Sequence, residues 1–339
     1  MNIDELDYYL PEDLIAQEPL TRRDEARLLV LRRKDGEIEH SRFYKLARHL
    51  NEGDLLVLND TRVVPARLFA NKESGGKVEI LFVRPMTERP GAWQAMVRAH
   101  RPLKEGTRLI LDDGHAIIVQ GYARPGRAIV ASENSVPLDT LIHAHGKLAL
   151  PHYIDREVTA SDAEDYQTVY AAHEGAIAAP TAGLHFTDGV FRSLAEAGVR
   201  RAFVTLHIGP GTFAPLRSEV VEQHSMEAEW YLIPPETAEA IAHTKRTGGR
   251  IVAVGTSSVR TLESYAVTGD VEGFTGLFIH PGFRFKLLDA MITNFHMPRT
   301  TVLALVMAMA GREKLLAAYR EAIRHRYRFL SYGDAMLIL

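Results

Sequence analysis

The hydrophobic positions of this chain gather in short runs, and each run ends in a loop of polar residues and glycine. Short apolar runs bounded by turn residues suit strands that are buried on both faces of a parallel sheet. Apolar residues at helical spacing separate the runs, so the pattern predicts alternating strands and helices and an α/β fold. The runs end at Leu58, Ala179, Ile208, Val254, Ile279 and Phe295.

Residues 175–213 show this pattern most clearly. We predict a buried strand over 175–179, a helix over about 187–197 and a second strand over 202–208. In such a unit the two strands are parallel, so the loops after them meet at one edge of the sheet. Ligands of α/β proteins bind at that edge, although loops of this kind can also be simple turns. The two loops supply these candidate residues: Thr181, Gly183, His185, His207, Gly209, Gly211 and Thr212.

The hydrophobic pattern changes between residues 64 and 148, where short segments of alternating apolar and polar residues follow one another. Turn signals such as Gly75-Gly76 separate strands predicted at 66–70, 77–83, 93–97, 108–111, 116–121 and 127–131. Short strands at this spacing are typical of a small antiparallel barrel. The sequence therefore indicates an α/β domain formed by residues 1–63 and 149–339, with a mixed, largely parallel sheet. An inserted six-stranded antiparallel β-barrel domain occupies residues 64–148.

The same reasoning predicts the remaining elements. A helix over 138–145 leads from the barrel back to the α/β domain. That domain includes strands over 230–233, 250–254, 277–279 and 291–295, and helices over 302–310 and 313–327.

Composition excludes several classes of function. The chain of 339 residues has no cysteine, which rules out disulfides, thiolate metal ligands and a cysteine nucleophile. The N-terminal residues 1–10 lack the apolar core of a signal peptide, and the segment 302–310 is too short to span a bilayer. We therefore expect a cytoplasmic protein. The net charge of −3 gives no global sign of nucleic-acid binding, which would need local basic patches.

Three histidines, His207, His280 and His296, stand at or directly after the end of a predicted strand. Histidine is the side chain best suited to proton transfer near neutral pH, so these positions suggest acid–base chemistry. A metal centre is the alternative interpretation. The sequence has no HxxxH or HExxH pattern on a helix, so we expect no metal.

Two further loops carry candidate binding residues. Gly255-Thr256-Ser257 begins a helix, and backbone amides at such a helix N-terminus form a cradle for an anion or carboxylate. The GxxxxGK[ST] and GxGxxG patterns of nucleotide-binding loops are missing. Asn59, Asp60 and Arg62 follow the strand at 55–58 and suggest another site, with an Asx turn as the equally acceptable alternative.

Basic residues offer local patches for phosphate. Arg320, Arg324 and Arg328 recur at four-residue spacing on the last predicted helix, and Arg260 lies on the helix that follows Ser257. A solvated helix face is the commoner meaning of such a stripe. The arginines on the barrel loops have the same two interpretations.

Eight motifs follow one another along nearly the whole chain: LVLNDTRVVPARL (56–68), YQTVYA (166–171), AAPTAGLHFT (178–187), VTLHIGPGTF (204–213), VAVGTSSVRTLES (252–264), HPGF (280–283), TNFHMP (293–298) and YRFLSYGDAM (327–336). In this order they resemble the S-adenosylmethionine:tRNA ribosyltransferase-isomerase family of queuosine biosynthesis. Two positions depart from the family pattern. His152 stands where the family usually has proline, and Glu227 stands where it often has histidine.

The resemblance implies an α/β domain with an inserted β-barrel, and a defined reaction. The substrate would be tRNA with a GUN anticodon that carries 7-aminomethyl-7-deazaguanine at the wobble position. The enzyme would move the ribosyl moiety of S-adenosylmethionine onto the aminomethyl group and isomerise it. Epoxyqueuosine-tRNA would form, with release of adenine and methionine. S-adenosylmethionine is then a co-substrate, and neither a cofactor nor a metal is implied.

This chemistry gives the candidate residues their roles. A sulfonium acidifies its neighbouring methylene, so the reaction needs a base, and adenine then needs a proton donor to leave. The acid–base candidates are His185, His207 and His296, with Asp60 orienting one of them or the incoming amine. The substrate-binding candidates are Asn59, Thr181, Gly183, Gly209, Gly211, Thr212, Gly255, Thr256, Ser257, Tyr332 and Asp334. The tRNA-phosphate candidates are Arg62, Arg260, Arg320, Arg324 and Arg328.

Two other classes of function fit parts of the sequence. An RNA-binding protein without catalysis would retain tRNA and leave S-adenosylmethionine intact, but polar residues at so many strand ends argue against it. A nucleotide hydrolase built on residues 255–257 would need magnesium, and the missing P-loop lysine argues against it. We expect no membrane partner, and a monomer in preference to a stable oligomer.

Overall fold

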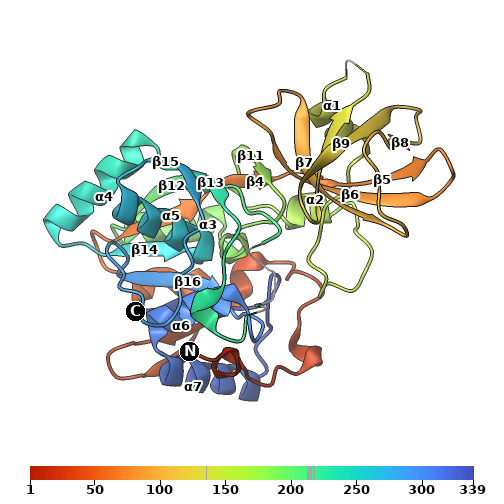
Figure 1. Ribbon diagram of the computed structural model, residues 1–339. Coiled ribbons are helices and arrows are strands. Elements are labelled where there is room, and N and C mark those ends of the chain that lie inside the picture. Colours follow the sequence, from red (N-terminus) through yellow and green to blue (C-terminus); the bar gives the residue numbers. More distant parts are fainter. Residues whose placement is uncertain (135, 212–215, 217) are drawn as a thin grey trace.

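The computed structural model describes residues 1–134, 136–211, 216 and 218–339. Within these residues, nine strands form one mixed sheet in the order β15-β13-β12-β3-β14-β16-β17-β1-β2 (Figure 1). The strands are β1 (Arg27–Leu31), β2 (Ile38–Arg42), β3 (Leu55–Asn59), β12 (Arg200–Leu206), β13 (Glu229–Leu232), β14 (Ile251–Val254), β15 (Glu272–Thr275), β16 (Ala290–Asn294) and β17 (Ala335–Ile338).

Helices cover both faces of this sheet. The α-helices are α1 (Leu138–His145), α2 (Asp162–Asp165), α3 (Asp188–Glu196), α4 (Pro235–Thr247), α5 (Gly255–Thr268), α6 (Thr301–Ala310) and α7 (Arg312–Arg324). The 3-10 helices are η1 (Ile3–Leu6), η2 (Glu12–Leu14), η3 (Arg23–Glu25), η4 (Phe43–His49), η5 (Thr181–His185) and η6 (Val221–Gln223).

The centre of the sheet is parallel and buried on both sides. β12, β3, β14 and β16 run side by side in the same direction, and every residue of β3, β14 and β16 is buried. Alternate residues of β3 serve the two faces, as the period of a strand requires. Leu55 and Val57 join the core beneath α4 to α7, whereas Leu56 and Leu58 join the core beneath η4 and α3. The carboxyl ends of four strands therefore share one edge.

The predicted barrel is confirmed. Over residues 67–132, all of which are described, six antiparallel strands close on themselves in the order β10-β7-β6-β5-β8-β9. They are β5 (Arg67–Lys72), β6 (Lys77–Pro85), β7 (Ala92–Ala99), β8 (Arg108–Ile110), β9 (Ala116–Arg124) and β10 (Arg127–Ser132). Alternate residues such as Val78, Ile80 and Phe82 fill the interior, and α1 packs Leu141 and Ile142 against the same core. Figure 1 shows the barrel standing beside the main sheet.

The strand predicted over 175–179 is not part of the main sheet, so that prediction was wrong. Instead, β11 (His173–Ala176) pairs in parallel with β4 (Thr61–Val63) in a separate two-stranded sheet (Figure 1). Gly175 adopts φ 148°, and a Cβ there would lie 2.6 Å from Nε2 of His207, so the chain departs from a regular ladder. The two predicted loops still meet, because the amide of Ile177 donates to the carbonyl of Ile208 at 2.9 Å.

Three other elements differ from the prediction. No strand forms over 277–279, because the chain turns after β15, where the amide of Leu277 donates to Oγ1 of Thr275. Helix α7 ends at Arg324, and Arg326 takes φ 53°, so the helix does not reach residue 327. The strand β17, which the sequence analysis did not predict, lies between β16 and β1. None of the helices in the described ranges is long and apolar enough to cross a membrane.

Candidate functional site

A narrow pocket lies at the carboxyl edge of the parallel strands, and we call it the strand-edge pocket. It consists of two adjoining hollows of about 30 Å³ each, which share Thr181, Asn294, His296 and Val302. Its other walls include Pro180, Ile208, Gly255, Thr256, Ser257, Thr293, Tyr153, Thr300 and Ser331. The sheet thus brings together residues from η5, β16 and the start of α5, as the strand-end pattern predicted.

The N-terminus of α5 faces this pocket. Gly255, at φ 84°, turns the chain sharply out of β14, a conformation that glycine adopts without a steric penalty. Val254 occupies the N-cap position and makes no side-chain capping bond. The first amides of the helix, together with the helix dipole, therefore favour an anionic group beside Thr256.

Asn59 organises this edge and does not present its side chain to a ligand. Its Nδ2 donates to the carbonyl of Leu206 and to Oγ of Ser257, both at 3.0 Å. Its Oδ1 accepts the amides of Thr61 and Leu206 at 3.1 and 3.0 Å. With these bonds the buried amide ties the ends of β3, β12 and α5 together, so we reassign Asn59 from substrate contact to a positioning residue.

His296 follows β16 and lines both hollows of the strand-edge pocket. Its Nε2 lies 2.7 Å from Oγ1 of Thr293, and its backbone amide donates to the Tyr319 hydroxyl at 3.1 Å. Burial lowers the pKa of His296 to about 3. The imidazole is therefore uncharged at neutral pH.

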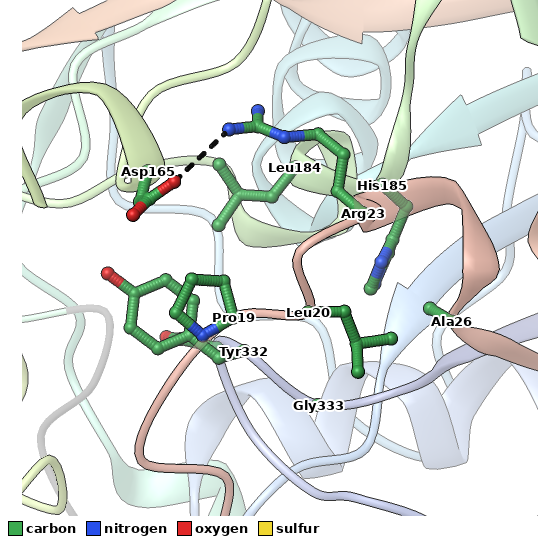
Figure 2. A pocket seen from close by; sticks show the side chains of 10 residues that line it. Pro19, Leu20, Arg23, Ala26, Asp165, Leu184, His185, Tyr332 and Gly333 are labelled. Atoms are coloured by element: carbon green, nitrogen blue, oxygen red, sulfur yellow. Dashed lines mark ion pairs between the residues drawn. The ribbon is translucent and has the colours of Figure 1, made fainter. Parts of the chain in front are cut away.

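His185 lies behind the same pocket and shares a network with it. Its Nε2 is 3.3 Å from Nδ2 of Asn294, whose Oδ1 accepts from Oγ1 of Thr181 at 2.9 Å. Figure 2 shows the imidazole turned toward a small hollow of about 20 Å³ beside Leu20 and Tyr332. Burial lowers the pKa of His185 to about 4. Asn294, which lies within the TNFHMP motif but was not a named candidate, connects the two predicted residues.

A much wider cavity lies between the barrel and the main sheet, and we call it the interdomain cleft. Its volume is about 870 Å³. The barrel side contributes Val83, Arg84, Pro85 and Trp93, and α1 contributes Asp139, Ile142 and His143. The facing wall contains Glu174, Gly175, His207, Gly209, Glu229, Trp230, Glu272 and Phe274.

His207 and Trp230 form a stacked pair on the wall of this cleft. Their ring centroids are 4.9 Å apart and the planes differ by 26°. Nδ1 of His207 lies 2.8 Å from Oγ1 of Thr61, which fixes the orientation of the ring. Burial, followed by the nearby charge of His173, lowers the pKa of His207 to about 4. The sequence analysis did not select Trp230 as a candidate, because a tryptophan at the start of a strand is equally compatible with a place in the hydrophobic core.

Asp60 is paired with a histidine that the sequence analysis did not select. The buried carboxylate accepts from Oγ1 of Thr205 at 2.7 Å and lies 3.2 Å from Nδ1 of His173. In the described part of the chain, the three predicted histidines bond to Thr61, Thr293 and Asn294 instead of Asp60. His173 is 57% exposed, so Asp60 connects the buried end of β3 with the surface.

The remaining substrate-binding candidates divide between packing and pocket positions. A Cβ at Gly183 would lie 2.0 Å from the hydroxyl of Tyr170, so Gly183 serves close packing. The amide of Gly209 donates to Oε1 of Glu229 at 2.7 Å in the interdomain cleft, and Gly211 lies beside Glu227. The hydroxyl of Tyr332 donates to Asp162 at 3.0 Å. Thr212 lies outside the described residues.

Two predictions are corrected by burial. Asp334 is 2% exposed and accepts from the backbone and side chain of Arg27 and from the amide of Arg328, so its carboxylate holds the chain ends together. Arg260 is 3% exposed. Its guanidinium pairs with Glu229 and donates to the carbonyls of Thr275 and Leu277. A buried guanidinium with these partners does not reach a tRNA phosphate.

The other arginine candidates do not form the predicted stripe. Arg320 is exposed near the end of α7, and Arg324 pairs with Glu321 at 2.7 Å. Arg328 lies beyond the helix, half-buried, and donates to the carbonyl of Glu18. Arg62 is exposed on β4, with Nη2 bonded to the carbonyl of Ala171 at 2.9 Å. Arg62 and Arg320 are the two that remain open to solvent-borne phosphate.

Comparison with known proteins places this geometry in context. The model of the "Queuosine biosynthesis protein" family matches residues 3–338. The chain belongs to that family. The S-adenosylmethionine:tRNA ribosyltransferase-isomerases of Halothermothrix orenii and Thermotoga maritima are 47% and 48% identical to this chain, with 100% of both chains covered in each case. The enzyme of the same name from Carboxydothermus hydrogenoformans is 50% identical, again over the full length of both.

A solved structure supports the same placement. The crystal structure of the S-adenosylmethionine tRNA ribosyltransferase from Thermotoga maritima covers 99% of this chain and 100% of its own, with 39% identity and a TM-score of 0.57. The resemblance of the motifs to this family is thereby confirmed, as is the fold class of a mixed α/β sheet with a barrel.

The two departures from the family pattern have different surroundings. His152 is exposed and its ring packs on Tyr153 at 5.7 Å. Glu227 lies at the join between the two parts of the molecule, where both carboxylate oxygens are 2.6 Å from Nη2 of Arg127 and a second ion pair reaches Arg124. Glu227 thus binds the β9–β10 hairpin of the barrel to the segment that precedes β13.

Proposed function

We propose that the chain transfers the ribosyl moiety of S-adenosylmethionine to 7-aminomethyl-7-deazaguanine at the wobble position of tRNA and isomerises it to give epoxyqueuosine, with release of adenine and methionine. Membership of the family makes the chain a tRNA ribosyltransferase-isomerase of queuosine biosynthesis, which is a transferase. The observation that carries the finer proposal is the pairing of an anion-binding pocket with a wide aromatic cleft on either side of residues 207–209.

The strand-edge pocket is proposed to hold the methionine end of S-adenosylmethionine. A carboxylate suits the amides at the start of α5, beside Gly255 and Thr256. Hollows of about 30 Å³ take only one end of such a molecule. The ribosyl and adenine groups would then extend past Ile208 toward the interdomain cleft.

The interdomain cleft is proposed to receive the modified base. A volume of about 870 Å³ is large enough for a nucleotide withdrawn from its stack. Trp230 and His207 offer a flat surface for stacking, and Trp93 faces the same cavity from the barrel. Because both parts of the molecule line the cleft, tRNA binding and catalysis would depend on their relative position.

Uncharged histidines suit the proposed chemistry. S-adenosylmethionine carries a positive sulfonium, which a protonated imidazole would repel. His296, His185 and His207 have pKa values of about 3 or 4, since burial disfavours the charged form, and so remain neutral. We propose that one of them accepts the proton from the methylene next to sulfur and that protonation then assists the departure of adenine. Methionine leaves as a neutral thioether, so the scheme needs no metal and no redox cofactor.

The tRNA is proposed to be of the GUN-anticodon type, held by phosphate contacts with Arg62 and Arg320. Their guanidinium groups are exposed, and each phosphate contact adds affinity that weakens with salt. We propose that the reaction takes place in the cytoplasm and that the chain acts as a monomer.

The deciding experiment combines the chain with S-adenosylmethionine and an anticodon stem-loop that carries 7-aminomethyl-7-deazaguanine. Mass spectrometry should detect free adenine and methionine and the corresponding gain in mass of the RNA. A matched stem-loop with guanine at the wobble position should give none of these products. Retention of the modified stem-loop with S-adenosylmethionine unchanged would instead identify an RNA-binding protein without this activity.

A further inference from the structure

A cluster of two histidines and one carboxylate lies on the barrel, apart from the pockets proposed for catalysis. Oδ2 of Asp113 is 2.7 Å from Nδ1 of His115 and 2.7 Å from Nε2 of His145. The three ligand atoms lie within 4.8 Å of one another. The side chains of Asp113, His115 and His145 are 36%, 35% and 26% exposed, so the cluster lies at the protein surface and is accessible to solvent.

The fold sets these side chains in place from two separate elements. Asp113 and His115 flank Gly114 in the tight turn between β8 and β9, where the amide of His115 donates to Oδ1 of Asp113 at 3.0 Å. His145 is the last residue of α1, which packs on the barrel through Leu141 and Ile142. The fold thus brings His115 and His145 together although thirty residues separate them in the sequence. A backbone amide orients the carboxylate of Asp113.

We propose that Asp113, His115 and His145 form a binding site for a divalent transition metal, with Zn²⁺ as the favoured ion. Imidazole nitrogens and a carboxylate are ligands that Zn²⁺ prefers, and three protein ligands leave a position for water. The metal would lie between Oδ2 and the two ring nitrogens, with each neutral imidazole carrying its proton on its other nitrogen. A small outward movement of the rings would make room for it, because the donors already converge.

The surroundings favour this cluster over a second one. His40, Glu321 and His325 also converge, on β2 and at the end of α7. There the guanidinium of Arg324 bonds to Glu321 at 2.7 Å and lies 3.1 Å from Nε2 of His325, so a fixed positive charge opposes a cation. Within the described residues, Asp113 forms ion pairs with the two histidines alone.

Metal binding at this site would act as a clip within the barrel. It would join the carboxyl end of α1 to the β8–β9 turn, and α1 also supplies Asp139, Ile142 and His143 to the interdomain cleft. The ion would therefore stabilise one wall of the cleft and take no part in proton transfer. The inference does not depend on the proposed function, because its test measures metal binding directly.

The test uses the full chain without an affinity tag, freed of metal by chelation. Titration with Co²⁺, which reports ligand geometry through visible absorption, and calorimetry with Zn²⁺ should both show one site per chain. His145→Ala should weaken the affinity at least about tenfold and abolish the Co²⁺ bands. Two control variants, His143→Ala on the same helix and His325→Ala in the second cluster, should bind metal as the original chain does.

Several results would overturn the proposal. One is the lack of saturable binding below about 1 mM metal, a concentration that corresponds to a weak general affinity. Another is unchanged binding by a His145→Ala variant whose circular dichroism shows a folded protein. A loss of binding in His325→Ala would assign the ion to the second cluster instead. As a second readout, Zn²⁺ should raise the thermal midpoint of the original chain and leave that of His145→Ala unchanged.

Discussion

The strand-edge pocket and the interdomain cleft are built in different ways. The pocket is a product of one sheet, and the side chains of Asn59 and Asn294 hydrogen-bond its strand ends to one another, to Thr181 and to His185. The cleft is formed between two parts of the chain. Among the described residues, the contacts that join them include the Glu227 ion pairs, the Arg84 guanidinium 5.0 Å from the Phe274 ring, His143 at 3.2 Å from Glu174, and the packing of Ile177 in the barrel core. The pocket is therefore preorganised, whereas the shape of the cleft depends on how the two parts pack against each other.

The largest expected effect comes from breaking the chemistry of the pocket. His296→Ala should lower kcat by about 10²-fold or more, the usual contribution of one acid–base group. Single-turnover release of adenine measures it. His152→Ala, at an exposed position outside both cavities, is the matched control and should keep full activity. Unchanged turnover in folded His296→Ala would remove this residue from the mechanism.

Loosening the cleft should affect binding more than chemistry. Glu227→Ala leaves Arg127, 8% exposed, without its carboxylate, and should cost about 1–3 kcal/mol of stability. We also expect KM for the stem-loop to rise about tenfold, which corresponds to a loss of about 1.4 kcal/mol in binding free energy, while kcat changes little. Arg124→Ala, which removes a 55% exposed partner, should cost less than about 1 kcal/mol. A fall in kcat at constant KM would contradict the comparison.

Acid should destabilise the pocket and the His207 side of the cleft. His296, His185 and His207 have folded-state pKa values of about 3, 4 and 4, below the unfolded value of about 6.5. Between these values the unfolded chain binds more protons, so the free energy of unfolding should fall as the pH drops from about 6.5 to 4. Urea midpoints at several pH values measure this. His296→Gln should make the free energy of unfolding depend less steeply on pH. An increase in the stability of the original chain toward pH 5 would contradict the prediction.

The smallest expected effect concerns the surface. Arg320→Ala should weaken stem-loop binding a few-fold and reduce the salt slope by about one, because one phosphate contact is lost. Arg324→Ala should do less, since its guanidinium is already paired with Glu321. Binding curves at three salt concentrations separate the two. Equal effects would mean that the Glu321 pair opens when RNA binds.

Local patterns made much of this molecule predictable. The barrel follows from alternation and turn residues that lie next to each other in the chain, and β6 keeps its predicted alternate burial. The pocket residues Gly255 and His296 were found because strand ends are visible in sequence. Pairing between distant segments was less visible. β17 is only four residues long, and it is a strand because β1 and β16 receive it on both sides.

The errors in the candidate site have the same origin. The sequence alone suggests that Arg260 is a surface cation. The fold places Glu229, 31 residues away, against its guanidinium. His173 and Trp230 were missed because their importance comes from neighbours, Asp60 and His207, that the sequence does not put beside them. Residue type and spacing therefore found the positions at strand ends, but they did not identify which charges are already neutralised by partners.

The position of β17 has a consequence for the order in which the chain acquires its structure during synthesis. Arg27 in β1 bonds to Asp334, 307 residues later, just before β17. The barrel strands all lie within residues 67–132. On the ribosome the barrel can close while most of the main sheet is still unmade, whereas β1 and β2 must wait for one of the last segments to emerge. The early hairpin would meanwhile expose an unpaired edge, a natural point for a chaperone to bind.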